Sequence, residues 1–306
     1  MDKIYDVIII GAGPAGITAG VYAARKGMDL IVLTGDIGGQ AAWSGDIENY
    51  TGYQFVTGSE LTAKFEEHMK KYSIPVKEQE EVTGIDKDGN FFAVSTLKGK
   101  YKARTVIVSS GKRSRELNVP GEEEFKNKGL TYCATCDGPL FSGKDVAIIG
   151  GGNSALDAAL QLIKIAGKIF IINIEPELKG DAIMREKVLK SDKVTVLNKT
   201  RITAILGEAF VKSIKVKKDE EEKEISVQGI FVEIGLIPNS GFTGLLDKNK
   251  QGEIEVNCAN ETSVPGIFAA GDVTNVPEKQ IIVAAGEGAK AALGAFKYIS
   301  KSREGG

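Results

Sequence analysis

Residues 5–16 read YDVIIIGAGPAG, and residues 144–155 read KDVAIIGGGNSA. In each stretch an Asp-Val pair opens an apolar run that ends in a glycine-rich turn. Each turn leads into a helical pattern, ITAGVYAARKG or LDAALQLIKIAG, that ends at a glycine, a common helix stop. Another apolar run follows, MDLIVL or KIFIIN. The sequence therefore predicts a strand, a turn, a helix and a strand at two places in one chain.

The glycine spacing gives both turns the pattern of a dinucleotide-binding βαβ unit. In that unit the first glycine makes the tight turn, the second lets a pyrophosphate approach the backbone, and the third position lets helix and strand pack closely. The helix N-terminus offers unpaired N–H groups to the phosphates. One such turn arises easily by chance, but a second in the same context predicts an α/β fold with two three-layer, Rossmann-like domains. The pattern positions are Gly11, Gly13 and Gly16 in the first turn and Gly150, Gly152 and Ala155 in the second.

Length and composition agree with two domains in a globular protein. A chain of 306 residues is long for one core. The net charge of −2 gives no electrostatic reason to expect nucleic acid or an anionic membrane as a partner. The N-terminus has no signal-peptide pattern, and no apolar run approaches the roughly 20 residues of a membrane span. We therefore expect a cytoplasmic location, and we interpret the charge run at 215–225 as a solvated hairpin tip.

A close pair of cysteines stands in YCATCDGPL (132–140), where Asp137 directly follows Cys136. Such a pair suits half of a metal site, a structural clip or a redox couple. In the cytoplasm a CxxC motif is more often catalytic or metal-binding than structural. A structural zinc site needs four nitrogen or sulfur ligands, and the chain adds only the isolated Cys258 and His68. We therefore expect no metal site, and we interpret Cys258 as a packed thiol and His68 as a surface residue.

The redox interpretation assigns a role to each of the three residues. A CxxC at a helix start lowers the thiol pKa, because the helix dipole favours the thiolate. Reduced flavin can pass electrons to a disulfide that touches its ring, and the dithiol then exchanges with a partner's disulfide. Asp137 can shuttle the proton that this chemistry requires, or it can cap the helix. Both roles of Asp137 stay open.

Two dinucleotide sites suggest a flavoprotein that pairs FAD with a nicotinamide. ETSVPGIFAAGDV (261–273) resembles the segment of FAD-dependent disulfide reductases whose aspartate binds the flavin's ribityl-phosphate region. TVIVSSGKR (105–113) resembles the strand and turn that close the first FAD half in those enzymes. The FAD domain is therefore expected to be discontinuous, with residues 1–114 and 243–306. Residues 115–242 would form the nucleotide domain that carries the cysteine pair.

Over nearly its whole length the chain resembles the low-molecular-weight, bacterial-type thioredoxin reductases. The stretches that carry this resemblance are GAGPAG, GGQ (38–40), IENY (47–50), YCATCDGPLF, IGGGNSALDAA, GIFVEIGLIPN (229–239), GIFAAGDV and KQIIVAAGEGAKAA (279–292). Locally, CDGPLF, PELK and VPEKQIIVAAGEGAKAALGAF are most similar to the reductase portion of the alkyl hydroperoxide reductase flavoprotein. That protein has extra N-terminal thioredoxin-like modules, whereas this chain starts at the FAD strand. The resemblance thus implies a homodimeric oxidoreductase that reduces a separate thioredoxin- or glutaredoxin-like partner.

The resemblance also implies roles for individual residues. Cys136 would face the flavin and accept electrons, and Cys133 would attack the partner disulfide. The nucleotide domain would rotate at hinges near 113–117 and 240–244 to serve both reactions. The implied FAD residues are Gly11, Gly13, Pro14, Ala15, Gly16, Thr34, Gly35, Gly39, Gln40, Asn49, Gly111, Gly271, Asp272, Lys279, Gln280 and Ile281. The implied nicotinamide residues are Gly150, Gly152, Asn153, Ser154, Ala155 and Glu175.

The segment INIEPELK departs from the pattern of NADPH-dependent relatives. Those proteins bind the 2′-phosphate with a His-Arg-Arg run and a later arginine. Here Asn173, Ile174 and Glu175 take the first three positions and Lys179 the later one. Glu175 would repel a phosphate, so NADPH is disfavoured. NADH is expected, because an acid near the strand end can take the ribose hydroxyls.

The electron donor nevertheless stays open, because the expected acid position holds Asn173, as the matching position in the first unit holds Thr34. Some relatives without the basic run take electrons from ferredoxin, although the intact second glycine turn argues for a nucleotide. The main alternative is therefore a ferredoxin-dependent flavin thioredoxin reductase. A non-catalytic flavin redox sensor is the alternative from another class. Tyr132 and Phe141 beside the motif are candidates for exposed aromatics that face a partner, or they pack around the disulfide.

Overall fold

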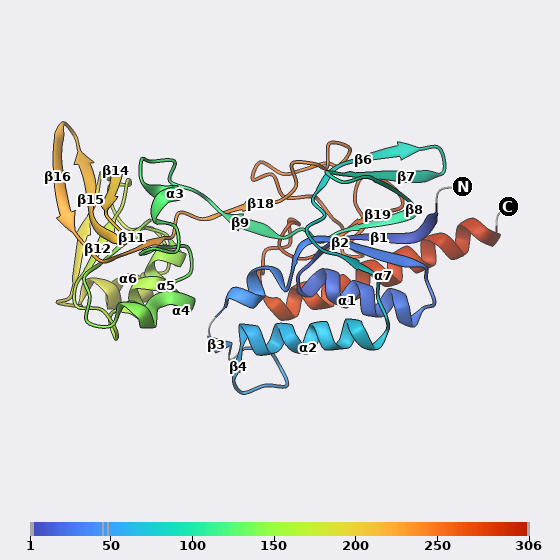
Figure 1. Cartoon of the computed structure of the whole chain (residues 1–306), viewed down its shortest axis with the longest axis horizontal. Coiled ribbons are helices and arrows are strands. Elements are labelled where there is room, and N and C mark those ends of the chain that lie inside the picture. Colours follow the sequence, from blue (N-terminus) through green and yellow to red (C-terminus); the bar gives the residue numbers. More distant parts are fainter. Residues whose placement is uncertain (1–2, 45, 48, 305–306) are drawn as a thin grey trace. The chain divides into compact units, whose positions relative to one another are not determined.

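The computed structural model describes residues 3–44, 46–47 and 49–304, without the side chains of residues 43, 46, 135–136 and 302–304. The chain divides into two compact units (Figure 1). Unit 1 comprises Met1–Arg113 and Ile237–Gly306, and unit 2 comprises Ser114–Leu236. Unit 1 is thus built from two separate stretches of chain, whereas unit 2 is continuous.

The chain returns to unit 1 at residue 237, six residues earlier than the boundary expected at 243. Asn239 explains this difference, because its backbone N–H donates to the carbonyl of Gly111 at 2.9 Å. Its side-chain amide donates to Ser110 O at 2.9 Å, and the Ser110 hydroxyl donates to Asn239 O at 2.6 Å. These bonds attach residue 239 to the end of the first stretch, so the chain has joined unit 1 before residue 243. The two connecting strands, β9 (Lys112–Ser114) and β18 (Leu236–Pro238), pair with one another.

Unit 1 is built on a sheet whose strands β5-β2-β1-β8 are parallel. Beyond β8 the sheet continues with β7 and β6, which pair in antiparallel. The end of β8 also pairs with β19 in parallel. A small ladder, β3 with β4, lies outside this sheet. The strands are β1 (Ile4–Ala12), β2 (Leu30–Ile37), β3 (Asp46–Ile47), β4 (Val56–Thr57), β5 (Val76–Lys77), β6 (Val82–Asp88), β7 (Phe91–Thr96), β8 (Lys100–Val108) and β19 (Ile267–Ala269).

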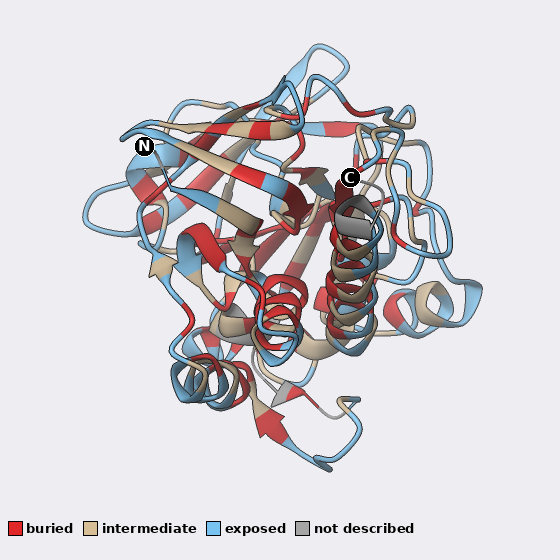
Figure 2. Cartoon of the chain, turned by 90° about the vertical axis from the view of Figure 1, so that its right-hand side faces the viewer, coloured by how far each residue is buried: buried red, intermediate tan, exposed pale blue. Residues whose placement is uncertain are grey.

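Helices cover one face of the parallel strands. The antiparallel strands β6 and β7 lie toward the other face of those parallel strands (Figure 1). The alternation along β1 explains the layers, because Val7 and Ile9 pack with the helices while Ile8 and Ile10 pack with residues of β6 and β7. Figure 2 shows buried residues along one side of α7, which ends near the C-terminus, and exposed residues along its outer side. The helices of unit 1 are α1 (Pro14–Arg25), the 3-10 helix η1 (Gly39–Trp43), α2 (Gly58–Lys71) and α7 (Ile281–Glu304).

Unit 2 repeats the three layers around a parallel sheet of order β10-β17-β11-β12-β13. Its strands are β10 (Leu130–Thr131), β11 (Val146–Ile149), β12 (Ile169–Ile172), β13 (Val194–Leu197) and β17 (Gly229–Val232). Its helices are α3 (Glu122–Phe125), α4 (Ala134–Asp137), η2 (Gly138–Phe141), α5 (Asn153–Leu162) and α6 (Ala182–Leu189). Ile148 faces α5, whereas Ala147 and Ile149 face the antiparallel sheet β14-β15-β16. The predicted α/β class with two Rossmann-like, three-layer domains is confirmed.

Two local predictions can be compared with the elements of unit 2. The charge run at 215–225 forms a hairpin, as predicted, because β15 (Val211–Lys218) pairs with β16 (Glu221–Ser226) next to β14 (Thr200–Gly207). The predicted end of α5 at Gly167 is wrong. The helix ends at Leu162, whose carbonyl accepts the N–H groups of both Ile165 and Ala166 in a turn. Among the described residues, no helix is long and apolar enough to cross a membrane.

Candidate active site

The first glycine turn joins β1 to α1 and has a different steric demand at each glycine. Gly11 has a φ of +99°, and a Cβ there would lie 2.5 Å from Ser109 O. A Cβ at Gly16 would lie 1.8 Å from Gly11 O, so only glycine lets helix and strand approach this closely. At Gly13 the nearest described heavy atom beyond the neighbouring residues, Gly38 O, would be 4.0 Å from the added Cβ. The middle glycine therefore borders open space, directly before a helix N-terminus that no described side chain caps.

The other predicted FAD residues gather at the same edge of the sheet. Parallel strands end at one edge, and ligands in such sheets bind there. Thr34 and Gly35 lie near the end of β2, Gly111 follows β8, and Gly271 and Asp272 follow β19. These strands are neighbours of β1, on either side or through β8. The edge thus combines the uncapped α1, open space at Gly13 and residues that end or follow three further strands, which fits a bound dinucleotide.

Several of these side chains already have partners within the protein. Thr34 Oγ1 accepts the Ala12 N–H at 3.1 Å and donates to Asp36 O at 2.5 Å. Gln40 Nε2 donates to the backbone carbonyl of Lys112 at 2.6 Å. Asn49 Nδ2 donates to Gln280 Oε1 at 3.0 Å, one residue before α7 begins at Ile281. The structure therefore brings together residues 40 and 112, and residues 49 and 280, from distant parts of unit 1.

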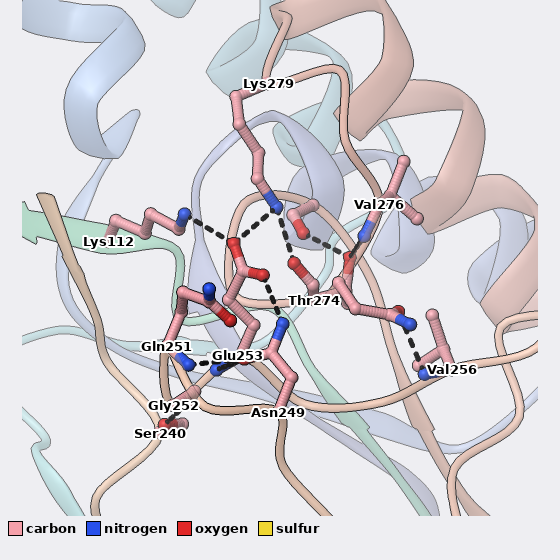
Figure 3. Close-up of polar contacts among 12 residues, drawn as sticks. Lys112, Ser240, Asn249, Gln251, Gly252, Glu253, Val256, Thr274, Val276 and Lys279 are labelled. Atoms are coloured by element: carbon pink, nitrogen blue, oxygen red, sulfur yellow. Dashed lines mark hydrogen bonds and ion pairs between the residues drawn. The ribbon is translucent and has the colours of Figure 1, made fainter. Parts of the chain in front are cut away.

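Sequence reasoning missed a charged cluster of Glu253, Lys112 and Lys279 (Figure 3), whose charges act on Asp272. Glu253 Oε1 contacts Lys112 Nζ at 2.7 Å and Lys279 Nζ at 3.2 Å, and Glu253 Oε2 accepts from Asn249 at 2.6 Å. Burial opposes ionisation of Glu253, but these donors outweigh it and lower its pKa to about 2. Burial raises the pKa of Asp272, while Lys279 and Lys112 oppose this. The cluster thus keeps one carboxylate charged between two lysines beside the predicted flavin ligand.

The second glycine turn joins β11 to α5 and repeats the geometry of the first. Gly150 has a φ of +137°, and a Cβ there would lie 2.2 Å from Glu233 O. A Cβ added at Gly152 would meet no described atom within 4 Å beyond the neighbouring residues, and no described side chain caps α5. Ala155 is fully buried against the sheet. Asn153 Oδ1 accepts the Asp181 N–H at 2.8 Å, whereas Ser154 is exposed. This turn also fits a dinucleotide phosphate.

The segment after β12 carries the residues that bear on the donor. Asn173 is buried, and its Nδ2 donates to the carbonyls of Glu175 and Glu177 and to Asn198 Oδ1. Its side chain thus holds the turn and is not a free acceptor for a ribose. The Glu175 carboxylate lies 2.9 Å from Lys179 Nζ in a partly exposed ion pair. The negative charge of Glu175 at this strand end is therefore balanced by the positive charge of Lys179.

The cysteine motif follows β10, a neighbour of β17 in the same sheet. Cys133 is held in a disulfide, and the side chain of Cys136 lies outside the described residues. The Asp137 N–H donates to Cys133 O across the single turn of α4. The Asp137 carboxylate accepts a short hydrogen bond from the Thr131 hydroxyl, which itself accepts the Cys133 N–H. Asp137 makes no side-chain cap to the following η2, so the capping alternative that the sequence left open is not found at that helix.

The expectations for nearby and isolated residues have mixed outcomes. Phe141 is buried and packs edge-on against Phe231, so it is not an exposed aromatic. Tyr132 is partly buried, and its hydroxyl donates to Glu122 at 2.7 Å. Cys258 is exposed rather than packed. It lies in a turn in which Asn257 Oδ1 accepts the N–H of residue 259 and the Asn257 carbonyl accepts the N–H of residue 260. His68 is exposed, as predicted.

Comparison with known proteins gives agreement over almost the entire chain. The family model described as pyridine nucleotide-disulphide oxidoreductase matches residues 5–288. A Bacillus subtilis protein named NADH dehydrogenase is 43% identical over 301 residues, which cover 97% of this chain and 59% of that protein. The F component of the alkyl hydroperoxide reductase of Pseudomonas putida is 41% identical over 307 residues, covering 98% of this chain and 59% of that protein. The chain thus spans about three fifths of the length of these curated relatives.

Solved structures extend the comparison to the fold. The crystal structure of Lactococcus lactis thioredoxin reductase matches with a TM-score of 0.83 and 34% sequence identity. The match covers 97% of this chain and 99% of the Lactococcus lactis chain. The similarity therefore includes both units and the connections between them.

Proposed function

Since this chain belongs to the pyridine nucleotide-disulphide oxidoreductase family, we propose that it is an FAD-dependent disulfide reductase of the thioredoxin reductase type. Its electrons would come from NADH and would leave through the Cys133–Cys136 pair to a thioredoxin- or glutaredoxin-like protein. The supporting observation is that Cys133, held in a disulfide, follows a strand of the sheet that also carries the second glycine turn. The Lactococcus lactis relative supports the thioredoxin-type substrate.

The residues divide the proposed reaction between the two units. Unit 1 would hold FAD, with its pyrophosphate at Gly13 and the N-terminus of α1 and its polar contacts at Gln40, Asp272 and Gln280. The chemistry that FAD would supply there is two-electron transfer from a nicotinamide to a disulfide. Unit 2 would bind the nicotinamide dinucleotide at Gly152.

The cysteines would then carry the disulfide exchange. Two electrons and two protons convert the Cys133–Cys136 disulfide to two thiols. The Cys133 thiolate attacks the partner disulfide, and the partner sulfur that leaves takes a proton. Cys136 then attacks the mixed disulfide, which releases the partner dithiol and restores the internal disulfide. Asp137, whose carboxylate accepts from the Thr131 hydroxyl, would exchange protons with the pair.

NADH is the proposed donor because Glu175 stands at a position where NADPH-dependent relatives carry a phosphate-binding arginine, so that its carboxylate would repel a 2′-phosphate. The name of the Bacillus subtilis relative supports the same donor. The test is anaerobic reduction of the purified protein's flavin by NADH, NADPH and reduced ferredoxin, with dithionite as the positive control. We expect NADH to bleach the flavin absorbance. Bleaching by dithionite but not by NADH would overturn this donor.

The role of the cysteine pair is tested by Cys136→Ser, with Cys258→Ser as the matched control. The first variant should still reduce flavin dyes with NADH but should lose at least about 99% of its turnover of thioredoxin or glutaredoxin disulfides. The control should keep both activities, because Cys258 is exposed and free. Full disulfide reduction by Cys136→Ser would refute the thiol assignment.

A ferredoxin-dependent reductase is the second candidate, and one observation favours it. The position that should hold a ribose-binding acid holds Asn173, whose amide is used within its own turn, and Glu175 is paired with Lys179. Stoichiometric reduction by photoreduced ferredoxin, with no response to either nicotinamide, would establish this alternative. The same measurement answers the redox-sensor hypothesis, because turnover of a thioredoxin with any donor dismisses it.

A further inference from the structure

An acidic residue that the proposed reaction does not use lies between the cysteine motif and the second glycine turn. Glu233 directly follows β17, whose two neighbours in the sheet are β10 and β11. The chain after β10 forms the cysteine motif, and the chain after β11 forms the glycine turn. Because parallel strands end at one edge, Glu233 sits between the two. Its N–H donates to Ile149 O at 2.8 Å, and its carbonyl limits the space at Gly150.

The side chain of Glu233 reaches the cysteine motif itself. Its carboxylate accepts the backbone N–H of Ala134, the residue after Cys133. Only the carbonyl carbon, Cα and Cβ of Cys133 separate that nitrogen from the Cys133 sulfur. A charge on Glu233 therefore lies beside the backbone that carries the thiol that the proposed function assigns to partner attack. We infer that Glu233 is a positioning residue of the thiol site whose charge state controls the reactivity of Cys133.

The surroundings of Glu233 make its charge variable near neutral pH. Burial is the main cause that raises the pKa of Glu233, Asp157 on α5 adds to it, and the Ala134 N–H opposes it; the resulting pKa is about 7. Two more acids approach these strand ends. Asp137 of α4 is engaged by Thr131, and Glu122 of α3 accepts from Tyr132 and from the backbone N–H groups of residues 117 and 118. Glu233 therefore changes charge in the pH range where thiolates form.

The direction of the effect follows from like charges. Below pH 7 Glu233 is mostly neutral and leaves the Cys133 thiolate unopposed. Above pH 7 it is mostly ionised, and a carboxylate beside a thiol raises the thiol pKa by about one unit or more. Glu233 and Cys133 should thus titrate as a coupled pair. This inference rests on the proposed function for the role of Cys133, but the coupling itself needs neither electron donor nor partner.

The experiment measures the alkylation rate of Cys133 by iodoacetamide from pH 5.5 to 9 in the whole 306-residue chain. Cys136→Ser and Cys258→Ser are present throughout, so Cys133 is the only thiol. Adding Glu233→Gln should accelerate alkylation about three- to tenfold at pH 7.5–8, and the two profiles should converge below pH 6. Glu186→Gln, an exposed carboxylate of unit 2 paired with Lys190, should leave the profile unchanged. Superimposable profiles with and without Glu233→Gln would overturn the inference.

A second measurement avoids any substitution at residue 233. The profile of the parent protein should depart from a single titration, with a change of slope near pH 7, and a single-ionisation curve would also overturn the inference. The outcomes separate from those of the proposed function. Absence of disulfide turnover together with divergent alkylation profiles removes the function and leaves the coupling. Disulfide turnover together with superimposable alkylation profiles would support the function and remove the coupling.

Discussion

At the scale of single residues, Gly13 and Gly16 belong to one turn but predict opposite consequences of adding a methyl group. In Gly16→Ala the Cβ would lie 1.8 Å from Gly11 O, so helix and strand must separate, and we expect a loss of at least about 1–3 kcal/mol of unfolding free energy. Gly13→Ala has room within the protein and should cost less than about 1 kcal/mol. Its methyl group would, however, fill the space proposed for the pyrophosphate, so the flavin content of this variant should fall. Urea unfolding and flavin absorbance per chain measure the two effects. A fully flavin-loaded Gly13→Ala protein would contradict this assignment of the turn.

The charge on Glu253 predicts a dependence of stability on pH. Its pKa is about 2 in the folded protein against an ordinary value of 4.5. A lowered pKa contributes stability above the ordinary value, here on the order of 3 kcal/mol, and this contribution is lost as the pH falls from about 4.5 toward 2. Glu253→Gln should therefore be much less stable than the parent at pH 7, and the difference should shrink at pH 3. Urea unfolding at both pH values tests this, with the exposed Glu255→Gln as control. A difference independent of pH would show that the carboxylate charge is not the cause.

At the scale of elements, the turn after β12 predicts nucleotide preference. Glu175→Ala removes the carboxylate nearest the expected 2′-phosphate and leaves Lys179 unpaired. We expect kcat/KM for NADPH relative to NADH to rise by about tenfold or more, since one negative charge becomes one free positive charge. Glu177→Ala, an exposed acid of the same turn, is the control and should change the ratio little. An unchanged ratio in Glu175→Ala would place the ribose elsewhere on unit 2.

The elements also indicate which features the sequence could predict. The two strand-turn-helix units were predictable because their signals are local, namely an apolar run, glycine spacing and helical periodicity. The Glu253 cluster was not, because Lys112 and Glu253 are 141 residues apart in the chain. Glu233 did carry a local signal, an acid directly after the four residues GIFV, but its meaning depends on the order β10-β17-β11. The prediction that Cys258 is packed was wrong. The alternating apolar residues before it suggested a buried position, but the chain turns there and exposes Cys258.

At the scale of the whole molecule, the sequence predicted the discontinuous domain but misplaced its second boundary. The repeated strand-turn-helix pattern located the insertion, and the GDV segment near residue 272 located the return. The position of the return depends on hydrogen bonds between residue 239 and residues 110–111. The residue pattern of one segment cannot predict such bonds, because the two partners are far apart in the sequence and meet only in the fold.

The division into two units predicts that unit 2 folds by itself. Residues 114–236 are continuous, and they enclose two apolar clusters, one on each face of their sheet. A segment with its own core is expected to fold alone. Excised 114–236 should therefore unfold cooperatively by circular dichroism, bind no FAD and bind NADH, which fluorescence titration detects.

The matched protein joins residue 113 to residue 237 through a Gly-Ser linker of about four residues, a short closure because β9 and β18 pair. That protein should retain FAD and lose NADH binding. An excised unit 2 without a cooperative transition would show that its core depends on unit 1, and FAD bound to unit 2 would reverse the assignment of the two sites.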